Sequence, residues 1–161
     1  MPSKLIIECS KTLRELGLTI AFAESATAGR IASEFSLTEH SGSILKGGLV
    51  CYDAEVKTDV LGIDPVFIQG CTAESKEVTQ KLATRLRNLI RSDIQVGVTG
   101  LTTPGGSETK EKPVGTIFIH FLVRDRSIAV REVFYGFPEE IVLSAADLAA
   151  STLIKELTNE L

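Results

Sequence analysis

The stretch L-T-I-A-F-A-E-S-A-T-A-G, residues 18–29, decides the predicted fold, because an apolar segment runs directly into a polar turn. Residues 18–23 are apolar and partly β-branched, which is typical of a buried strand. Residues 27–35 place Ile31 and Phe35 four positions apart, the spacing of one helix face. The stretch therefore predicts a strand, a polar loop and a helix in succession.

The same alternation continues along the chain. Helices are predicted over residues 4–16, 54–61, 72–90 and 138–157, and strands over residues 49–52, 94–98, 115–123 and 127–133. The charged triplet 124–126 separates two apolar strands and predicts a hairpin. This order predicts an α/β fold, a three-layer α/β/α domain around a mixed, mostly parallel sheet with one antiparallel hairpin. No repeat or linker divides the sequence, so residues 1–161 are expected to form a single domain.

Composition excludes several classes of function. The 161 residues carry 17 Lys and Arg against 21 Asp and Glu, so the net charge of -4 offers no positive field for a polyanion, and a nucleic-acid partner is not expected. No apolar run approaches the ~20 residues that cross a bilayer, so no membrane partner is expected either. The first residues lack the pattern of an export signal, and the three cysteines form no C-x-x-C motif. We expect a reduced, cytoplasmic protein.

The histidines do not predict a metal site. His40 and His120 lie far apart in the sequence, and no carboxylates stand at ligand spacing beside them. His120 lies inside a predicted strand, where a hydrogen-bonded packing role is expected. We therefore predict neither a metal nor a cofactor.

Three polar loops follow predicted strands, so we expect them at one edge of the sheet. The first contains Glu24, Ser25 and Thr27 at the start of a predicted helix. Ser25 or Thr27 can serve as the helix N-cap. Alternatively, the loop is an anion or amide site at the helix N-terminus, with Glu24 as a carboxylate partner. No G-x-S-x-G nucleophile elbow is present.

The second loop contains Tyr52 and, five residues later, Lys57. A phenol and an ammonium group can orient a substrate carbonyl, and a desolvated lysine can act as general base for a serine. The alternative interpretation is the start of a surface helix.

The third loop, residues 99–112, is rich in Gly, Thr and Pro. Its glycines, Gly100, Gly105 and Gly106, would let backbone N–H groups approach phosphate or carboxylate oxygens, and Lys112 would add positive charge. A flexible surface loop is the alternative interpretation.

Together these loops resemble the CinA family of competence/damage-inducible proteins, specifically its C-terminal domain, which also occurs alone. The resemblance rests on A-E-S-x-T-x-G at 23–29, G-G-x-x-x-Y-x-x-x-x-K at 47–57, V-T-G-L at 98–101, and P-G-G and K-P-V-G-T at 104–106 and 112–116. It implies a homo-oligomeric, metal-independent amidohydrolase of pyridine nucleotide recycling. Such an enzyme converts nicotinamide mononucleotide and water to nicotinic acid mononucleotide and ammonia.

The resemblance also assigns site residues. It places the orienting tyrosine and threonine at Tyr52 and Thr99, and the lysine of a serine–lysine pair at Lys57. The serine of that pair falls between Ser41 and Ser43, which are the candidate nucleophiles, with Ser25 as a third candidate.

Departures from the family pattern fall on the ligand-facing motifs. An arginine is expected early in the last helix, near Val142, but residues 138–146 contain none. Two functions follow as alternatives: an active nicotinamide-nucleotide amidohydrolase, or a catalytically weak or inactive module that binds a nucleotide or regulates a partner.

Overall fold

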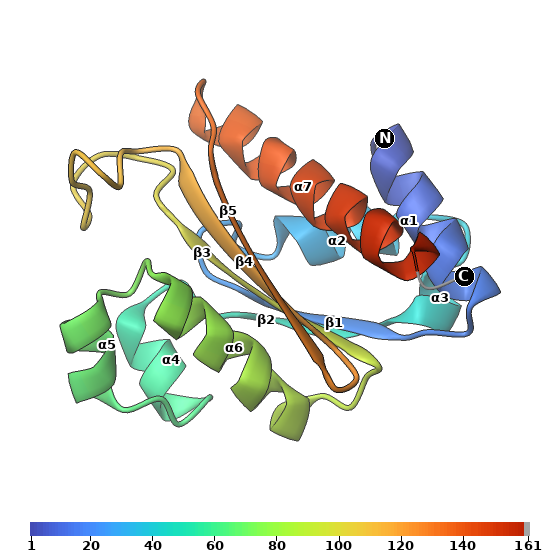
Figure 1. The fold of residues 1–161 in the computed structure, drawn as a ribbon, viewed down its shortest axis with the longest axis horizontal. Coiled ribbons are helices and arrows are strands. Elements are labelled where there is room, and N and C mark those ends of the chain that lie inside the picture. The colour runs from blue at the N-terminus through green and yellow to red at the C-terminus, as the bar shows by residue number, and fades with distance from the viewer. Residues whose placement is uncertain (160–161) are drawn as a thin grey trace.

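The computed structural model describes residues 1–159, so the last two residues of the predicted domain lie outside the described residues. The helices are α1 (Lys4–Glu15), α2 (Arg30–Ser36), α3 (Ser41–Ile44), α4 (Ala54–Asp59), α5 (Pro65–Cys71), α6 (Lys76–Leu89) and α7 (Pro138–Thr158) (Figure 1). The strands are β1 (Ile20–Glu24), β2 (Leu45–Val50), β3 (Ile94–Gly100), β4 (Thr116–Val123) and β5 (Arg126–Val133).

The five strands form one sheet in the order β2-β1-β3-β4-β5. Strand β1 pairs in parallel with β2 and β3, whereas β4 is antiparallel to both β3 and β5. Four of these five strands therefore run in one direction, and β4 runs against them. The predicted mixed, mostly parallel sheet and its antiparallel hairpin are confirmed.

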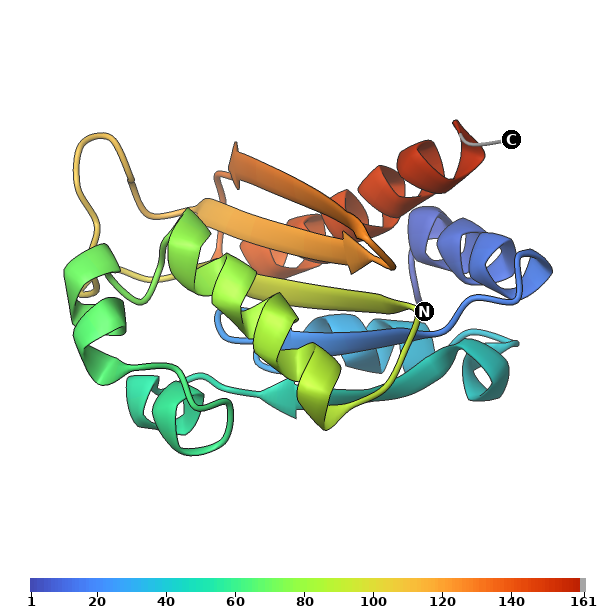
Figure 2. The ribbon, with the colours of Figure 1, turned by 60° about the horizontal axis from the view of Figure 1, so that its bottom comes forward.

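Helices cover both faces of the sheet and give the predicted three layers (Figures 1 and 2). Helices α1, α2 and α7 lie on one face, where Phe22 and Phe35 pack with ring centroids 5.3 Å apart in the larger core cluster. Helix α6 lies on the other face, with α4 and α5 beside it. Within residues 1–159, none of the helices combines the length and the apolar character needed to cross a membrane.

Helix α6 packs closely on the sheet at Gly97. A Cβ atom there would lie 2.5 Å from the carbonyl oxygen of Thr79, so any side chain would push the helix away. The helix begins at Lys76, four residues later than predicted, because the Ser75 side chain caps it by accepting from the Val78 N–H group at 3.2 Å.

Strand β2 and the two short helices α3 and α5 differ from the sequence prediction. Strand β2 begins at Leu45 rather than at residue 49, because glycines at 47 and 48 fit within it. A Cβ at Gly48 would lie 3.2 Å from that of Ala32, so the missing side chain lets α2 approach the strand. The seven-residue helix α5 was not predicted, although Asp64 and Pro65 are typical of a helix start.

The parallel strands β1, β2 and β3 end at the same edge of the sheet. The loops that follow them begin at residues 25, 51 and 101. The last is long and reaches α5 in the view of Figure 2, where its Lys112 donates to Thr72 and Glu74, just after that helix. Candidate polar side chains from all three loops are thus brought to this edge, as expected for a parallel sheet.

Candidate functional site

Lys57 is a buried lysine in α4, with 1% of its surface exposed. The helix is fixed at its start by Asp53, whose side chain accepts from the Glu55 N–H group at 2.8 Å. The Lys57 Nζ donates to the carbonyl oxygens of Cys51 at 2.6 Å and Tyr52 at 3.3 Å. Its third partner is the Ser25 Oγ, at 3.0 Å.

Burial lowers the pKa of Lys57 from its ordinary value, although nearby acidic groups partly oppose this effect. The neutral amine is therefore more accessible here than at a surface lysine. A neutral amine has two N–H donors and one lone pair. In the structure the Nζ donates to the Ser25 Oγ, and the Ser25 hydroxyl donates to the Tyr52 carbonyl at 3.5 Å. In the neutral amine the carbonyls of Cys51 and Tyr52 can accept both N–H groups, so that the lone pair would face the Ser25 hydroxyl. This is the arrangement that a lysine needs to activate a serine.

Ser25 is the first residue after β1, and its N–H group extends the sheet by donating to the carbonyl of Val98 at 2.9 Å. The turn that follows passes through the left-handed backbone region at Ala28 (φ 47°) and Gly29 (φ 88°). The side chain of Ser25 is 8% exposed and lies in the wall of a cavity. A small opening thus connects the hydroxyl to solvent.

This cavity has a volume of about 190 Å³. Its walls come from the three loops at the sheet edge, the end of β3 and the segment before α6. The lining residues are Ser25, Ala26, Tyr52, Glu74, Gly100, Leu101, Thr102, Thr103, Pro104, Gly105 and Gly106. Tyr52 is 61% exposed and is among the lining residues. Glu74 is the one charged side chain among these lining residues.

All three predicted glycines line the cavity, and two of them leave little room for a Cβ atom. A Cβ at Gly100 would lie 2.5 Å from the carbonyl oxygen of Thr116, and one at Gly106 would lie 2.8 Å from the Leu101 side chain. The N–H group of Gly105 donates to the Glu108 carboxylate at 2.8 Å. That N–H group therefore serves the loop itself rather than a ligand.

Lys112 occupies a different position from the one predicted. Its ammonium donates to the Thr72 hydroxyl at 2.9 Å, the Glu74 carbonyl at 2.8 Å and the Ser107 hydroxyl at 2.9 Å. All three of its N–H groups are thus used to tie the long loop to the segment before α6. In this arrangement Lys112 anchors the long loop.

Glu24 and Thr27 also turn inward. The Glu24 carboxylate is 1% exposed and accepts from the Thr27 hydroxyl at 2.6 Å and from the N–H groups of Gly29, Ile31 and Ala32 at 3.1, 3.0 and 2.8 Å. The predicted anion at this helix N-terminus is therefore the protein's own carboxylate. Both residues build the turn that presents Ser25, and neither is free for substrate.

Thr99 is fully buried, and its hydroxyl pairs with that of Thr79 on α6 at 2.7 Å. It is not among the residues that line the cavity at Ser25. The structure thus directs the predicted orienting hydroxyl of Thr99 into the interface with α6.

The structure separates Ser41 and Ser43 from Lys57. Both serines lie in α3, before β2, whereas Lys57 follows the strand's other end. Six residues of strand span about 20 Å. The Ser43 hydroxyl instead donates to the His40 carbonyl at 2.9 Å. Ser25, the third candidate nucleophile, is the serine beside the buried lysine.

Sequence reasoning missed two contributors. Glu74 lines the cavity and accepts from the Ser107 hydroxyl at 2.5 Å, but a single acidic residue before a helix carries no signal in the sequence. Cys51 contributes its backbone carbonyl, which any residue would supply. The sequence would have indicated this carbonyl only if the contact between Lys57 and Ser25 had been predicted first.

The chain was compared with known proteins. The model of the CinA C-terminal domain matches residues 3–157. A competence-damage inducible protein of Moorella thermoacetica is 34% identical over 140 residues, which are 87% of this chain and 34% of that protein. A CinA-like protein of Mycolicibacterium paratuberculosis is 42% identical over 101 residues, 63% of this chain and 23% of that protein. The chain therefore spans about a third or less of the length of these curated relatives.

Solved structures agree over the whole fold. A CinA superfamily protein of Klebsiella pneumoniae is 25% identical, with a TM-score of 0.90 over 97% of both chains. A competence/damage-inducible protein of Agrobacterium tumefaciens is 28% identical, with a TM-score of 0.87 over 98% of both chains. Together with the family match, these similarities show that the chain belongs to the CinA family and has the fold of its C-terminal domain.

Proposed function

We propose that this chain is a metal-independent amidohydrolase that releases ammonia from nicotinamide mononucleotide, with Ser25 as nucleophile and Lys57 as general base. The observation that carries the proposal is the 3.0 Å contact between the Lys57 Nζ and the Ser25 Oγ at the wall of a cavity. A serine hydroxyl is a weak nucleophile unless an adjacent base accepts its proton. Burial lowers the pKa of Lys57 and so favours the neutral amine that can accept this proton.

The reaction has two steps. Neutral Lys57 takes the proton of Ser25 as the Oγ forms a bond to the amide carbon. The proton then passes to the amide nitrogen, the carbon–nitrogen bond breaks, ammonia leaves, and an ester remains on Ser25. Water attacks this ester while Lys57 accepts its proton. The carbon–oxygen bond to Ser25 breaks, the Oγ recovers the proton, and the carboxylic acid leaves.

The tetrahedral intermediate of each step needs hydrogen-bond donors for its oxyanion. The N–H group of Ala26 directly follows the nucleophile, and Ala26 lines the cavity. Within residues 1–159, this N–H group has no protein acceptor, so it is available for the oxyanion.

The charge of the cavity favours a pyridinium amide. Nicotinamide mononucleotide carries its amide on a cationic ring, and Glu74 supplies a negative charge among the lining residues. Tyr52, which is largely exposed beside Ser25, can cover the ring with its own. The phosphate would extend out of the cavity, because no basic side chain is among the described lining residues.

That last feature supports a second candidate function, a module that binds the nucleotide without turnover. The cavity lacks a lining cation, and residues 138–146 contain no arginine. A charge-assisted contact to phosphate is among the stronger hydrogen bonds that a protein can offer. Its loss would weaken substrate binding without altering Ser25 or Lys57.

Ammonia release from nicotinamide mononucleotide by the purified protein tests the proposal. We expect turnover that Ser25→Ala reduces by about 10⁴-fold or more, since knocking out a nucleophile removes the covalent route. The matched control is Ser43→Ala, which removes an equal hydroxyl from α3 and should retain full turnover. If Ser43→Ala lost activity while Ser25→Ala remained active, Ser43 rather than Ser25 would be the nucleophile.

Calorimetric titration of nicotinamide mononucleotide into the Ser25→Ala variant distinguishes the two candidate functions. Binding by this variant, together with turnover by the natural protein, supports the amidohydrolase. Binding without turnover by either protein supports the nucleotide-binding module.

A further inference from the structure

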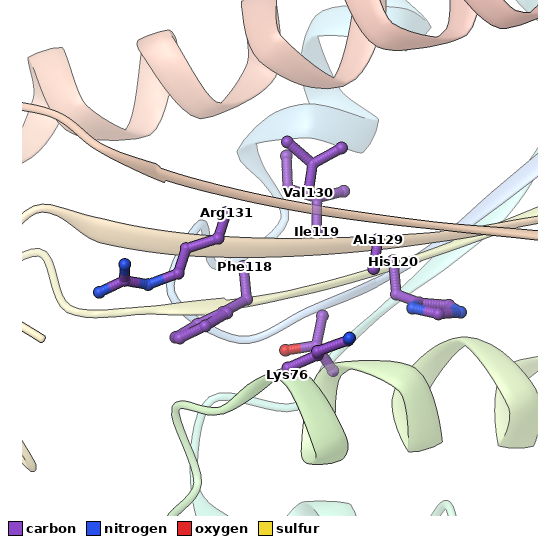
Figure 3. A pocket seen from close by; sticks show the side chains of 8 residues that line it. Lys76, Phe118, Ile119, His120, Ala129, Val130 and Arg131 are labelled. Atoms are coloured by element: carbon purple, nitrogen blue, oxygen red, sulfur yellow. The ribbon is translucent and has the colours of Figure 1, made fainter.

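A second cavity, of about 190 Å³, lies between α6 and the β4–β5 hairpin (Figure 3). Figure 3 shows Phe118 and His120 pointing from β4 toward α6, with Lys76 facing them from the helix. Arg131 from β5 lies at the Phe118 end. The cavity shares no lining residue with the one at Ser25, so it is a separate feature of the fold.

His120 has an unused hydrogen-bonding atom in this wall. Its side chain is 4% exposed, and its Nε2 lies 2.6 Å from the Ser127 Oγ. Its Nδ1 is buried and has no partner among residues 1–159. The Ser127 hydroxyl can donate to Nε2, which places the ring proton on Nδ1. Buried polar atoms without partners are uncommon, and an absent ligand is one explanation.

The charges around the cavity are positive. The Arg131 guanidinium carbon lies 5.7 Å from the centroid of the Phe118 ring. The Lys76 ammonium forms no ion pair with any carboxylate of the part of the chain that the structure describes. Burial, and then the charge of Lys76, lowers the pKa of His120, so the imidazole is neutral and donates as an N–H group. These groups together favour an anion.

We propose that this cavity binds a small aromatic carboxylate. The ring lies against Phe118, and the carboxylate accepts from the Nδ1–H group of His120 and from the ammonium of Lys76. Arg131 adds positive charge at the other end of the ring. An apolar cavity of about 150 Å³ holds benzene, so the space here is sufficient for one substituted ring.

The cavity is also placed to influence the site at Ser25. Lys76 stands two residues after Glu74, which lines the first cavity. Thr79 lines the second cavity, and its hydroxyl bonds to that of Thr99. The neighbour of Thr99, Val98, accepts a hydrogen bond from the N–H group of Ser25 through its carbonyl. The short segment 74–79, which spans the start of α6, therefore borders both cavities.

Benzoate, titrated into the isotopically labelled full chain and followed by NMR, tests the proposal. We expect shifts of the His120 imidazole and the Phe118 ring, with a dissociation constant on the order of 1 mM for so small a ligand. Benzyl alcohol, a neutral probe of similar shape, should bind at least about tenfold more weakly, because the carboxylate makes the polar contacts.

Two variants of α6 provide the matched comparison. Lys76→Gln should weaken benzoate binding by about tenfold, whereas Arg85→Gln, which removes an exposed cation from the same helix, should not. His120→Gln should weaken it as well, and thermal unfolding of each variant establishes that it is folded. Equal binding of benzoate and benzyl alcohol would overturn the proposal, as would shifts confined to Ser25 and Tyr52.

Discussion

Two charged side chains are buried at neighbouring strand ends, and they differ in what surrounds them. Glu24 ends β1, Lys57 follows β2, and each is 1% exposed. Glu24 accepts four hydrogen bonds, all from its own turn and α2. Lys57 has two carbonyl partners and a third partner, the Ser25 hydroxyl, that faces a cavity.

This difference separates a structural charge from a reactive one. A buried ion is tolerated when the fold supplies all its hydrogen bonds. A buried amine whose partner is a hydroxyl can exchange a proton with it, because both atoms donate and accept. The comparison predicts that loss of Glu24 damages stability, and loss of Lys57 damages catalysis.

Between these two buried charges, the largest expected effect is that of Lys57→Met on turnover. Methionine has a similar length and is apolar, so the buried site remains filled while the base is lost. We expect kcat/KM for nicotinamide mononucleotide to fall by about 10³–10⁴-fold, or about 4–5.5 kcal/mol in barrier height. Ammonia release by wild type and variant measures this loss. Full activity in a folded Lys57→Met variant would remove the serine–lysine assignment.

The pH dependence of the wild type supplies a control for that result. Lys57 must be neutral to accept the Ser25 proton, so kcat/KM should rise with pH as the ammonium titrates. Because burial lowers the pKa of Lys57 below its ordinary value of 10.5, the rise should be complete at a lower pH than for an exposed lysine. A profile that falls as pH increases over this range would contradict the role of base.

The next largest effect is that of Glu24→Ala on stability. The variant leaves the buried N–H group of Ile31 and the partly buried N–H groups of Gly29 and Ala32 without their acceptor. We expect the free energy of unfolding to fall by about 3–5 kcal/mol, measured by urea denaturation. Glu24→Gln, which keeps one acceptor oxygen, should lose less.

A matched control is Glu8→Ala, which removes an exposed carboxylate from α1 and should change stability by less than about 0.5 kcal/mol. A Glu24→Ala variant as stable as this control would show that the turn does not depend on the buried carboxylate.

The same comparison shows what the sequence could and could not predict. The strand and helix pattern was sufficient for the sheet and the hairpin, because hydrophobic periodicity records which face of each element is buried. Lys57 and Tyr52 were predicted by their place after a strand. The direction in which each polar side chain points was not predicted, since Glu24, Thr99 and Lys112 all form hydrogen bonds with other residues of the protein. Periodicity says nothing about such partners when they are distant in sequence, as Lys57 and Ser25 are.

A smaller effect is expected from Thr99→Val, which tests one of those inward directions. The change removes the hydrogen bond to Thr79 at the interface with α6 and preserves the side-chain shape. Stability should fall by about 1 kcal/mol, because Thr79 keeps its bond to the Ser75 carbonyl. Urea denaturation measures the loss, and kcat/KM should stay unchanged. A large loss of turnover in a variant of unchanged stability would show that Thr99 contributes to catalysis.

The smallest effect concerns the electrostatics around the reactive charge. Asp53 caps α4 and its negative charge raises the pKa of Lys57, against the larger lowering by burial. Asn is an equally good N-cap, so Asp53→Asn keeps the helix start and removes only the charge. The pKa of Lys57 should then fall further, and the rise of kcat/KM with pH should move to lower pH. Asp53→Ala, which also removes the cap, should lose about 1 kcal/mol of stability in addition. A pH profile that moves upward in Asp53→Asn would mean that the titrating group is not an amine beside this carboxylate.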